Sequence, residues 1–243
     1  MRNPRLYYPD LIKSENMITL DKGASHYLYQ VLRCKSGQTI EMFNGNGLVC
    51  DAVIISSDKH SISVQIQQFQ QYDTESPLAI TLALGISKGE RMDTAIQKAV
   101  ELGVHTIQPL QTEFSVVRLK PERAKKRLQH WHRIITSACE QCGRNTLPTL
   151  LPILTFYDWL NQERDTDCWL FHPDSTTRLS AVKKPTQGVT ILIGPEGGLS
   201  ENEIINASSR EFSALNFGPR ILRTETAAIA SLAAIQTLWG DMG

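Results

Sequence analysis

Hydrophobic and polar residues follow two different patterns along the chain, and the change falls near residue 75. Before it, the segments QTIEMF, LVCDAVII and SISVQIQQF alternate between apolar and polar positions or are rich in β-branched residues, as strands are. Turn residues 44–47 (Asn-Gly-Asn-Gly) follow the first segment, and a short helix is expected from Ala24 to Leu32. We therefore predict a small β-barrel over residues 1–72.

After a polar linker at residues 72–77, strands and helices alternate as far as the end of the chain. The expected strands are LAITLALGIS, HTIQPLQ, DCWLFH, GVTILIG and SALNFG, and the expected helices cover about 90–102, 121–142, a segment after Ser200, and 224–239. This order predicts an α/β domain over residues 73–243, with a mostly parallel sheet between helices. The last helix is apolar almost all round, which predicts burial within the domain or against a partner.

Charge is balanced over the whole chain but concentrated in one stretch. The sequence has 25 basic and 25 acidic residues, yet residues 118–144 hold eight basic side chains against two acidic ones. Such a cluster can hold a phosphate backbone, or it can be an ordinary solvated helix face. The zero net charge of the whole chain argues against a protein that coats nucleic acid without selection.

The five cysteines are odd in number and scattered, which favours a reducing cytoplasm over a disulfide framework. Cys139 and Cys142 form a CxxC, but no second CxxC or histidine pair stands at zinc-ligand spacing, so we expect no metal. The N-terminus has no apolar stretch of signal-peptide length, and no run of about 18 apolar residues occurs. We expect a cytoplasmic protein that does not enter membranes.

Ligands of open α/β sheets bind beyond the carboxyl ends of the strands. The loops that follow the expected strands DCWLFH, GVTILIG and SALNFG are therefore the candidate ligand-binding loops. The middle loop, residues 193–200, reads IGPEGGLS and leads into a helix that Ser200 and Glu203 cap. Its three glycines allow close approach of backbone to a ligand, although a plain strand-to-helix turn has the same composition. The loop is neither GxGxxG nor a P-loop, which argues against dinucleotides and nucleoside triphosphates.

The loop at residues 217–227, FGPRILRTETA, places Arg220, Arg223 and Glu225 at the start of the apolar last helix. Charges beside a buried element are costly unless they are paired or used, so we favour a functional role for this cluster over a merely exposed one.

Five segments, in order, resemble one known family. They are SHYLYQVLR (25–33), SKGERMDTAIQKAVELGV (87–104), ACEQCGRN (138–145), ILIGPEGGLSENEI (191–204) and FGPRILRTETAA (217–228). Together they span almost the whole chain and resemble the RsmE-like SPOUT family, which methylates N3 of one uridine of 16S ribosomal RNA with S-adenosylmethionine. Phe217 stands where that family tends to have leucine, a mild departure.

The resemblance implies an N-terminal PUA-like RNA-binding barrel, a SPOUT domain with a C-terminal trefoil knot, and a homodimer. It also implies methylation at uridine 1498 in standard rRNA numbering, on the assembled small ribosomal subunit. Carried over by position, the cofactor would contact three loops, largely through backbone groups. The residues are Leu170, Phe171, His172, Ile193, Gly194, Pro195, Glu196, Gly197, Gly198, Phe217, Gly218, Ile221, Leu222, Arg223, Thr226 and Ala227.

Methylation of uracil N3 requires loss of a proton while negative charge builds on the flanking carbonyl oxygens. We expect Arg223 to stabilise that charge. Glu225 or Glu196 is expected to accept the proton or to orient Arg223, with His172 a weaker candidate. Expected RNA phosphate contacts are Arg2, Arg5, Arg33, Lys88, Arg91, Lys98, Arg118, Lys125, Lys126, Arg127 and Arg144.

Two other interpretations remain open from the sequence. One is a non-catalytic rRNA-binding assembly factor with the same fold, which the intact loops at 194–198 and 220–225 argue against. The other is an unrelated α/β enzyme with a different nucleotide-like cofactor, which the missing dinucleotide and triphosphate motifs argue against.

Overall fold

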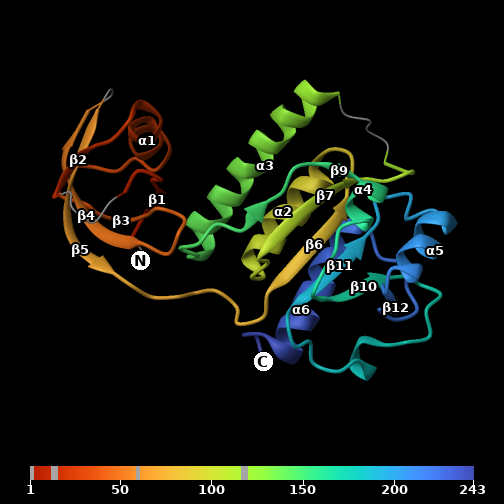
Figure 1. Ribbon diagram of the computed structural model, residues 1–243. Helices are drawn as coiled ribbons and strands as arrows, with labels where there is room; N and C mark the ends of the chain where they lie inside the picture. The colour runs from red at the N-terminus through yellow and green to blue at the C-terminus, as the bar shows by residue number, and fades with distance from the viewer. Residues whose placement is uncertain (1–2, 12–15, 59–60, 116–119) are drawn as a thin grey trace. The chain divides into compact units, whose positions relative to one another are not determined.

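The computed structural model describes residues 3–11, 16–58, 61–115 and 120–243 (Figure 1). The chain forms two compact units. The first contains residues 1–75 together with residues 139–147, and the second contains residues 76–138 and 148–243. The second unit is thus interrupted by a short segment that belongs to the first.

The first unit is a five-stranded sheet with strand order β1-β3-β4-β5-β2. All neighbouring pairs are antiparallel except β1 and β3, which are parallel. Leu28, fully buried in the π-helical turn after α1, packs into the core of this sheet with Ile40 and Ile54. The elements are β1 (Arg5–Tyr7), β2 (Met17–Thr19), α1 (Lys22–His26), the π-helical turn Tyr27–Val31, β3 (Thr39–Phe43), β4 (Val49–Ser57) and β5 (Ile62–Gln70).

Arg5 joins the distant segment 139–147 to this sheet. Its guanidinium donates hydrogen bonds to the carbonyl oxygens of Gly143 and Arg144, each at 3.0 Å, and lies 2.7 Å from a carboxylate oxygen of Glu41. Its side chain is only 2% exposed. Both terminal nitrogens of this buried guanidinium have acceptors, although its Nε has none among the described residues, so these contacts tie the segment to the sheet.

Two further ionic side chains fix the same segment. Glu140 accepts hydrogen bonds from the amide of Tyr7 and the hydroxyl of Tyr27, each at 3.0 Å. Burial and the neighbouring Glu140 raise the pKa of Tyr27 to about 12. Arg144 forms an ion pair with Glu75, and the two side chains are only 5% and 12% exposed. Residues 139–147 are therefore an integral part of the first unit.

The second unit contains an all-parallel sheet with strand order β12-β10-β11-β6-β7-β8, and β9 also pairs with β7. The mostly parallel sheet expected from the sequence is thus confirmed. Its elements are β6 (Ile80–Gly85), α2 (Glu90–Glu101), β7 (Thr106–Gln111), α3 (Pro121–Cys142), β8 (Thr149–Leu150), β9 (Leu154–Thr155), α4 (Phe156–Leu160), β10 (Asp167–Phe171), η2 (Leu179–Ala181), β11 (Val189–Ile193), α5 (Glu201–Ser209), β12 (Ser213–Leu215) and α6 (Thr224–Trp239). The last turn of α3 is part of the first unit.

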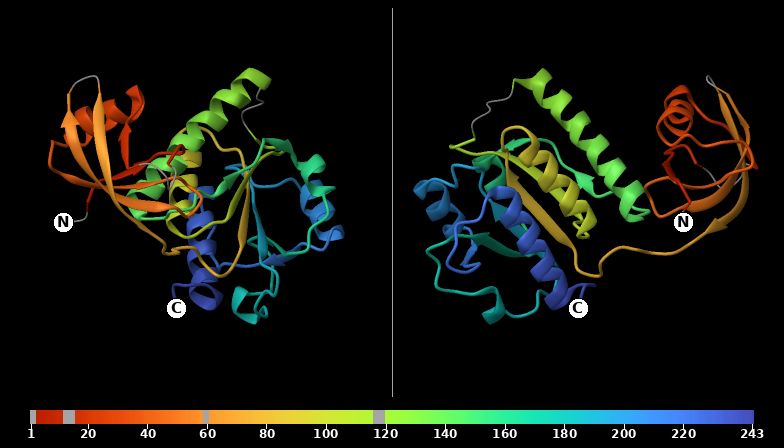
Figure 2. Two further views of the ribbon diagram at one scale, coloured as in Figure 1. Left: turned by 60° about the vertical axis from the view of Figure 1, so that its left-hand side comes forward. Right: turned by 180° about the vertical axis from the view of Figure 1, so that it is seen from behind.

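Helices cover both faces of this sheet. Alternate residues of each strand point to opposite faces, so neighbouring residues of one strand contact different helices. Leu170 and Leu192 belong to the core formed with α4 and α5. Trp169, one position earlier, faces the other way, and its ring lies 5.6 Å from that of Trp239 on α6. Helices α2 and α6 run side by side on that second face (Figure 2). In the described part of the chain, no helix is long and apolar enough to cross a membrane.

Candidate cofactor and RNA site

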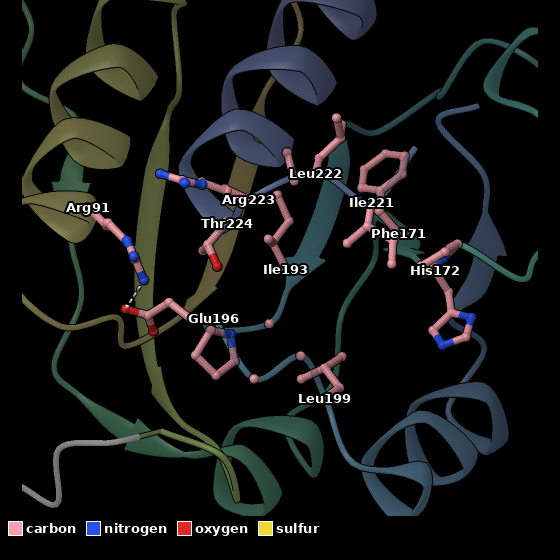
Figure 3. A pocket seen from close by; sticks show the side chains of 16 residues that line it. Arg91, Phe171, His172, Ile193, Glu196, Leu199, Ile221, Leu222, Arg223 and Thr224 are labelled. Carbon is pink, nitrogen blue, oxygen red and sulfur yellow. Dashed lines mark hydrogen bonds and ion pairs between the residues drawn. The ribbon is translucent and has the colours of Figure 1, made fainter. Parts of the chain in front are cut away.

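A cavity of about 550 Å³ opens at the carboxyl ends of β10 and β11, beside the start of α6 (Figure 3). That volume lies within the usual range for a site that takes one small-molecule ligand. Segments far apart in the sequence meet in it, as expected for the carboxyl edge of a parallel sheet. Its lining residues are Arg91, Phe171, His172, Pro173, Ile193, Gly194, Pro195, Glu196, Gly197, Gly198, Leu199, Ile221, Leu222, Arg223, Thr224 and Ala227.

The glycines of the 193–200 loop are required by the shape of the loop. A Cβ atom on Gly194 would lie 2.8 Å from the carbonyl carbon of Gly198 and 2.9 Å from the Leu199 nitrogen, so a side chain there would force the loop open. Gly198 has open space around it but a φ of +74°, which favours glycine. Gly85, at the end of β6, packs against Pro195, and a Cβ there would lie 2.5 Å from the proline ring.

Glu196 connects this loop to the segment that leads from β6 into α2. Its Oε1 accepts hydrogen bonds from the Lys88 amide at 3.0 Å and from the Arg91 guanidinium at 3.1 Å. Burial raises the pKa of this carboxyl, but hydrogen bonds from its own amide, from Lys88 and from Arg91 outweigh burial, and the pKa lies below its ordinary value. Glu196 is therefore an ionised carboxylate that holds Arg91 at the cavity.

The cavity has a charged side and an apolar side. Arg223 is the N-cap residue of α6, and its guanidinium extends toward α2, the side on which Arg91 and Glu196 lie (Figure 3). Leu222 and Phe171 lie on the other side (Figure 3). The site can thus receive a ligand with an apolar ring at one end and anionic groups at the other.

Most of the residues that the sequence places in the cofactor loops line this cavity, but four do not. Leu170 is fully buried in the sheet core, and Thr226 lies exposed on α6. Phe217 and Gly218 line a smaller neighbouring cavity of about 90 Å³, where the Phe217 ring meets Phe171 edge-on at 4.8 Å.

The three candidate proton acceptors differ in their position. Glu196 and His172 line the cavity, whereas Glu225 does not. The backbone amide of Asp174 donates to Nδ1 of His172 at 3.3 Å, which occupies the nitrogen that a neutral ring would use as a base. Oε2 of Glu225 is buried and has no hydrogen-bond partner among the described residues.

Other residues contribute to the cavity as well. Pro173 and Leu199 line it just beyond the expected loops, Thr224 lines it within the expected loop at 217–227, and Arg91, expected only as a phosphate contact, lines it too. The position of Arg91 in the first turn of a helix that follows a strand was the available signal, because such helix starts lie at the carboxyl edge of the sheet.

The expected RNA contacts fall into four groups, of which the first three are as follows. Arg33, Lys88 and Arg91 are exposed, and so are Lys125 and Lys126, while Arg127 is half-exposed. Lys98 is half-buried and lies 2.8 Å from Glu101, which reduces its availability to phosphate. Arg2 and Arg118 lie outside the described residues.

Two of the expected phosphate contacts need correction. Arg5 and Arg144 are each only 4% exposed and are engaged by Glu41 and Glu75 respectively. Binding phosphate would require breaking ion pairs of buried arginines and leaving a largely buried carboxylate without its cation, which is costly. Both arginines are structural.

Known protein families match both units of the chain. Two protein-family models match the chain, an RNA methyltransferase domain over residues 74–236 and an RNA methyltransferase PUA domain over residues 20–67. The fold and site thus define an RNA methyltransferase of the class with a PUA domain, and the PUA-like first unit expected from the sequence is confirmed.

Relatives narrow the class to one family. Ribosomal RNA small subunit methyltransferase E of Buchnera aphidicola (subsp. Schizaphis graminum) is 37% identical over 242 residues, which are 99% of this chain and 98% of that protein. The protein of the same name from Bacillus subtilis is 33% identical, over 86% of each chain. The chain belongs to the ribosomal RNA small subunit methyltransferase E family.

Two solved structures are similar to this chain in both fold and sequence. Ribosomal RNA small subunit methyltransferase E of Neisseria gonorrhoeae, bound to S-adenosylmethionine, has a TM-score of 0.93 and 39% identity, with all of both chains covered. A Legionella pneumophila protein in complex with S-adenosylmethionine has a TM-score of 0.95 and 37% identity, covering 99% of this chain and 100% of that one.

Proposed function

We propose that this protein methylates N3 of one uridine of 16S ribosomal RNA, with S-adenosylmethionine as the methyl donor and the small ribosomal subunit as substrate. The observation that carries the proposal is the cavity at the carboxyl edge of the sheet, with a glycine loop on its wall and Arg91 and Arg223 on its charged side. Family membership supports the same assignment.

The residues of the cavity fit the methyl donor. Gly194, Gly197 and Gly198 leave backbone groups accessible, and Ile193, Ile221 and Leu222 supply apolar walls suited to an adenine ring. When bound, S-adenosylmethionine supplies an electrophilic methyl group. The methionine carboxylate is negatively charged, and uracil becomes so as N3 loses its proton, which the charged side of the cavity suits.

Arg223 is the residue that we assign to transition-state stabilisation. As N3 loses its proton, charge develops on the two neighbouring carbonyl oxygens of uracil, and a fixed guanidinium beside them lowers the barrier. Removal of one such donor typically reduces the rate by about 10²- to 10³-fold. Arg223→Ala is therefore expected to lower the single-turnover rate by that amount at saturating RNA, and an unchanged rate would refute the role.

The contacts of Glu196 favour a positioning role over proton transfer. Its lowered pKa makes it a weak base, and its Oε1 is already occupied by Lys88 and Arg91. Since Nδ1 of His172 is also engaged, we propose that the N3 proton leaves to solvent. The methylation rate then rises with pH as the deprotonated fraction of uracil grows.

RNA binding is assigned to exposed cations outside the cavity. In the second unit, Lys88 and the exposed lysines at 125 and 126 of α3 are available for phosphate, and in the first unit Arg33 is. The target uridine has to leave its stack before N3 becomes accessible, so these contacts hold the surrounding strand. The proposal places the protein in the cytoplasm, where ribosomal subunits are made.

A second copy of the chain is the proposed partner of α6. The sequence predicted burial of this helix within the domain or against a partner, and within the chain Leu238 is 49% exposed and Ala230, Ala233 and Ala234 are only half-buried. An apolar helix face left in water favours association. Light scattering on the purified protein is expected to give a dimer mass, and a monomer at micromolar concentration would refute this.

The trefoil knot remains an expectation from the family resemblance.

Calorimetry with three ligands tests the cofactor assignment. We expect S-adenosylmethionine to bind, and NAD and ATP not to bind. Incubation with unmethylated small subunits is then expected to yield 3-methyluridine in the 16S RNA. Binding without methylation would favour the rRNA-binding assembly factor, and binding of NAD or ATP alone would favour a different α/β enzyme.

A further inference from the structure

An exposed aromatic side chain stands next to the glycine loop of the cavity. Phe114, in the loop after β7, is 46% exposed. A Cβ atom placed on Gly197 would lie 2.9 Å from Cβ of Phe114 and 3.6 Å from its Cγ. Because Gly197 lines the cavity, the phenyl group is adjacent to the cavity wall.

A buried carboxylate holds the two loops in register. Glu203 is 1% exposed, and its Oε2 accepts a hydrogen bond from the Ser200 amide at 2.9 Å, as the capping box requires. Its Oε1 accepts a hydrogen bond from the Glu113 amide, also at 2.9 Å. One side chain thus fixes the residue before Phe114 and the end of the cavity loop at the same time.

A second set of hydrogen bonds makes the Phe114 loop rigid. The Ser115 hydroxyl accepts from the Thr112 amide at 3.1 Å and lies 2.9 Å from the Thr112 hydroxyl, and both residues are buried. The backbone on both sides of Phe114 is therefore anchored. The backbone that carries the phenyl group is thus held beside the cavity loop.

We propose that Phe114 is a stacking platform for a nucleobase of the bound RNA strand at the mouth of the cavity. The inference rests on the proposed function, because a uridine whose N3 is methylated must leave its stack, and unstacked bases bind aromatic faces. The sequence favours RNA over an apolar protein surface as the partner, since Arg123, the first basic residue of α3, follows Phe114 by nine positions.

Two substitutions at Phe114 test the platform, because they distinguish the flat aromatic face of the side chain from its apolar volume. Phe114→Leu keeps an apolar side chain but removes the flat face, whereas Phe114→Trp keeps the face. Tyr157→Leu on α4 is the matched control, because Tyr157 is also 46% exposed but does not lie against a glycine of the cavity loop as Phe114 does. Each protein is measured for affinity to unmethylated small subunits, for single-turnover methylation, and for S-adenosylmethionine affinity by calorimetry.

We expect Phe114→Leu to weaken subunit binding or the single-turnover rate by roughly 5- to 100-fold, the range for loss of one base stack. Phe114→Trp and Tyr157→Leu are expected to stay within about twofold of the parent protein. All four proteins are expected to bind S-adenosylmethionine equally, because the cavity loop is fixed by Glu203 and not by the phenyl ring.

Three results would overturn the platform. They are a Phe114→Leu variant that matches the parent on RNA, equal losses in the leucine and tryptophan variants, and a loss confined to S-adenosylmethionine affinity. In all three the parent protein still methylates small subunits, and the proposed function stands. A parent protein that methylates no RNA would instead refute the proposed function itself.

Discussion

Gly194→Ala is the substitution for which the structure gives the sharpest expectation. Its new methyl group would lie 2.8 Å from the carbonyl carbon of Gly198 and 2.9 Å from the Leu199 nitrogen. Carbon atoms in contact are ordinarily about 3.5–4.0 Å apart, so the loop has to open by about 0.7 Å. Both contacts are backbone atoms, which cannot rotate away as a side chain would.

The size of the effect follows from what the loop provides. A shift of about 0.7 Å is enough to take a backbone hydrogen bond out of its normal range, and a donor or acceptor left unsatisfied costs about 1–3 kcal/mol. We therefore expect S-adenosylmethionine affinity to fall by roughly 5- to 150-fold. Gly198→Ala differs because its Cβ would meet no atom within 4 Å. Its backbone strain of about 1–2 kcal/mol is present with and without ligand, so affinity changes little.

Calorimetry with S-adenosylmethionine on the two variants checks this. Gly37→Ala is the control, because Gly37 has a φ of +84° and open space around it but lies in the first unit. We expect the control to bind like the parent protein. Parental affinity in Gly194→Ala, or a larger loss in Gly198→Ala than in Gly194→Ala, would refute the reasoning.

Three further predictions concern charge. The pKa of Glu196 is lowered, so its contribution is present above the ordinary carboxyl pKa of 4.5 and is lost only as the pH falls through the lowered value. We thus expect S-adenosylmethionine affinity to be independent of pH in the neutral range, and Glu196→Gln to weaken it by at most about fivefold, since Arg91 is half exposed; a titration in that range would contradict this. Arg144→Ala strands a buried carboxylate and is expected to destabilise the first unit by about 3–5 kcal/mol without loss of S-adenosylmethionine binding, which scanning calorimetry and titration can measure; an unshifted melting curve would disprove it. Replacing residues 125–127 with alanine is expected to weaken RNA binding and to reduce its log-log salt slope by about 0.7–0.9 for each lost phosphate contact, and a parental slope would identify a solvated helix face.

Hydrophobic periodicity predicted the long elements well, because each is long enough to show its period. Helix α3 was expected at residues 121–142, and the structure has Pro121–Cys142. Strands β1 and β2 have three residues each, and β8 and β9 have two, too few for any pattern to appear. The five-residue helix α4 was overlooked for the same reason.

The membership of residues 139–147 in the first unit could not be read from the sequence. The helix pattern runs through residue 142 without a break, and nothing in it marks the change of unit. The deciding contacts join Arg5 to carbonyl groups 138 and 139 positions away. Charged residues in that segment were for this reason interpreted as phosphate contacts, although Arg144 is an internal ion-pair partner.

For the site, the sequence indicated which loops meet but not how their side chains pair. Strand order in a parallel sheet brings carboxyl ends together, which was enough to bring the segments at 171–173, 193–199 and 221–227 to one cavity. That Glu196 pairs with Arg91, 105 positions away, depends on the order of β11 and β6 in the sheet. The second role of Glu203, which holds Glu113, arises in the same way from long-range packing.

The most direct test of the central claim is mass spectrometry of 16S ribosomal RNA from a strain that lacks this gene. We expect 3-methyluridine to disappear from one position of the small-subunit RNA in this strain. A plasmid copy of the parent gene is expected to restore it, and a copy carrying Arg223→Ala is expected to restore it slowly or not at all. Persistence of 3-methyluridine at full level in the deletion strain, or loss of a different modification, would contradict the account.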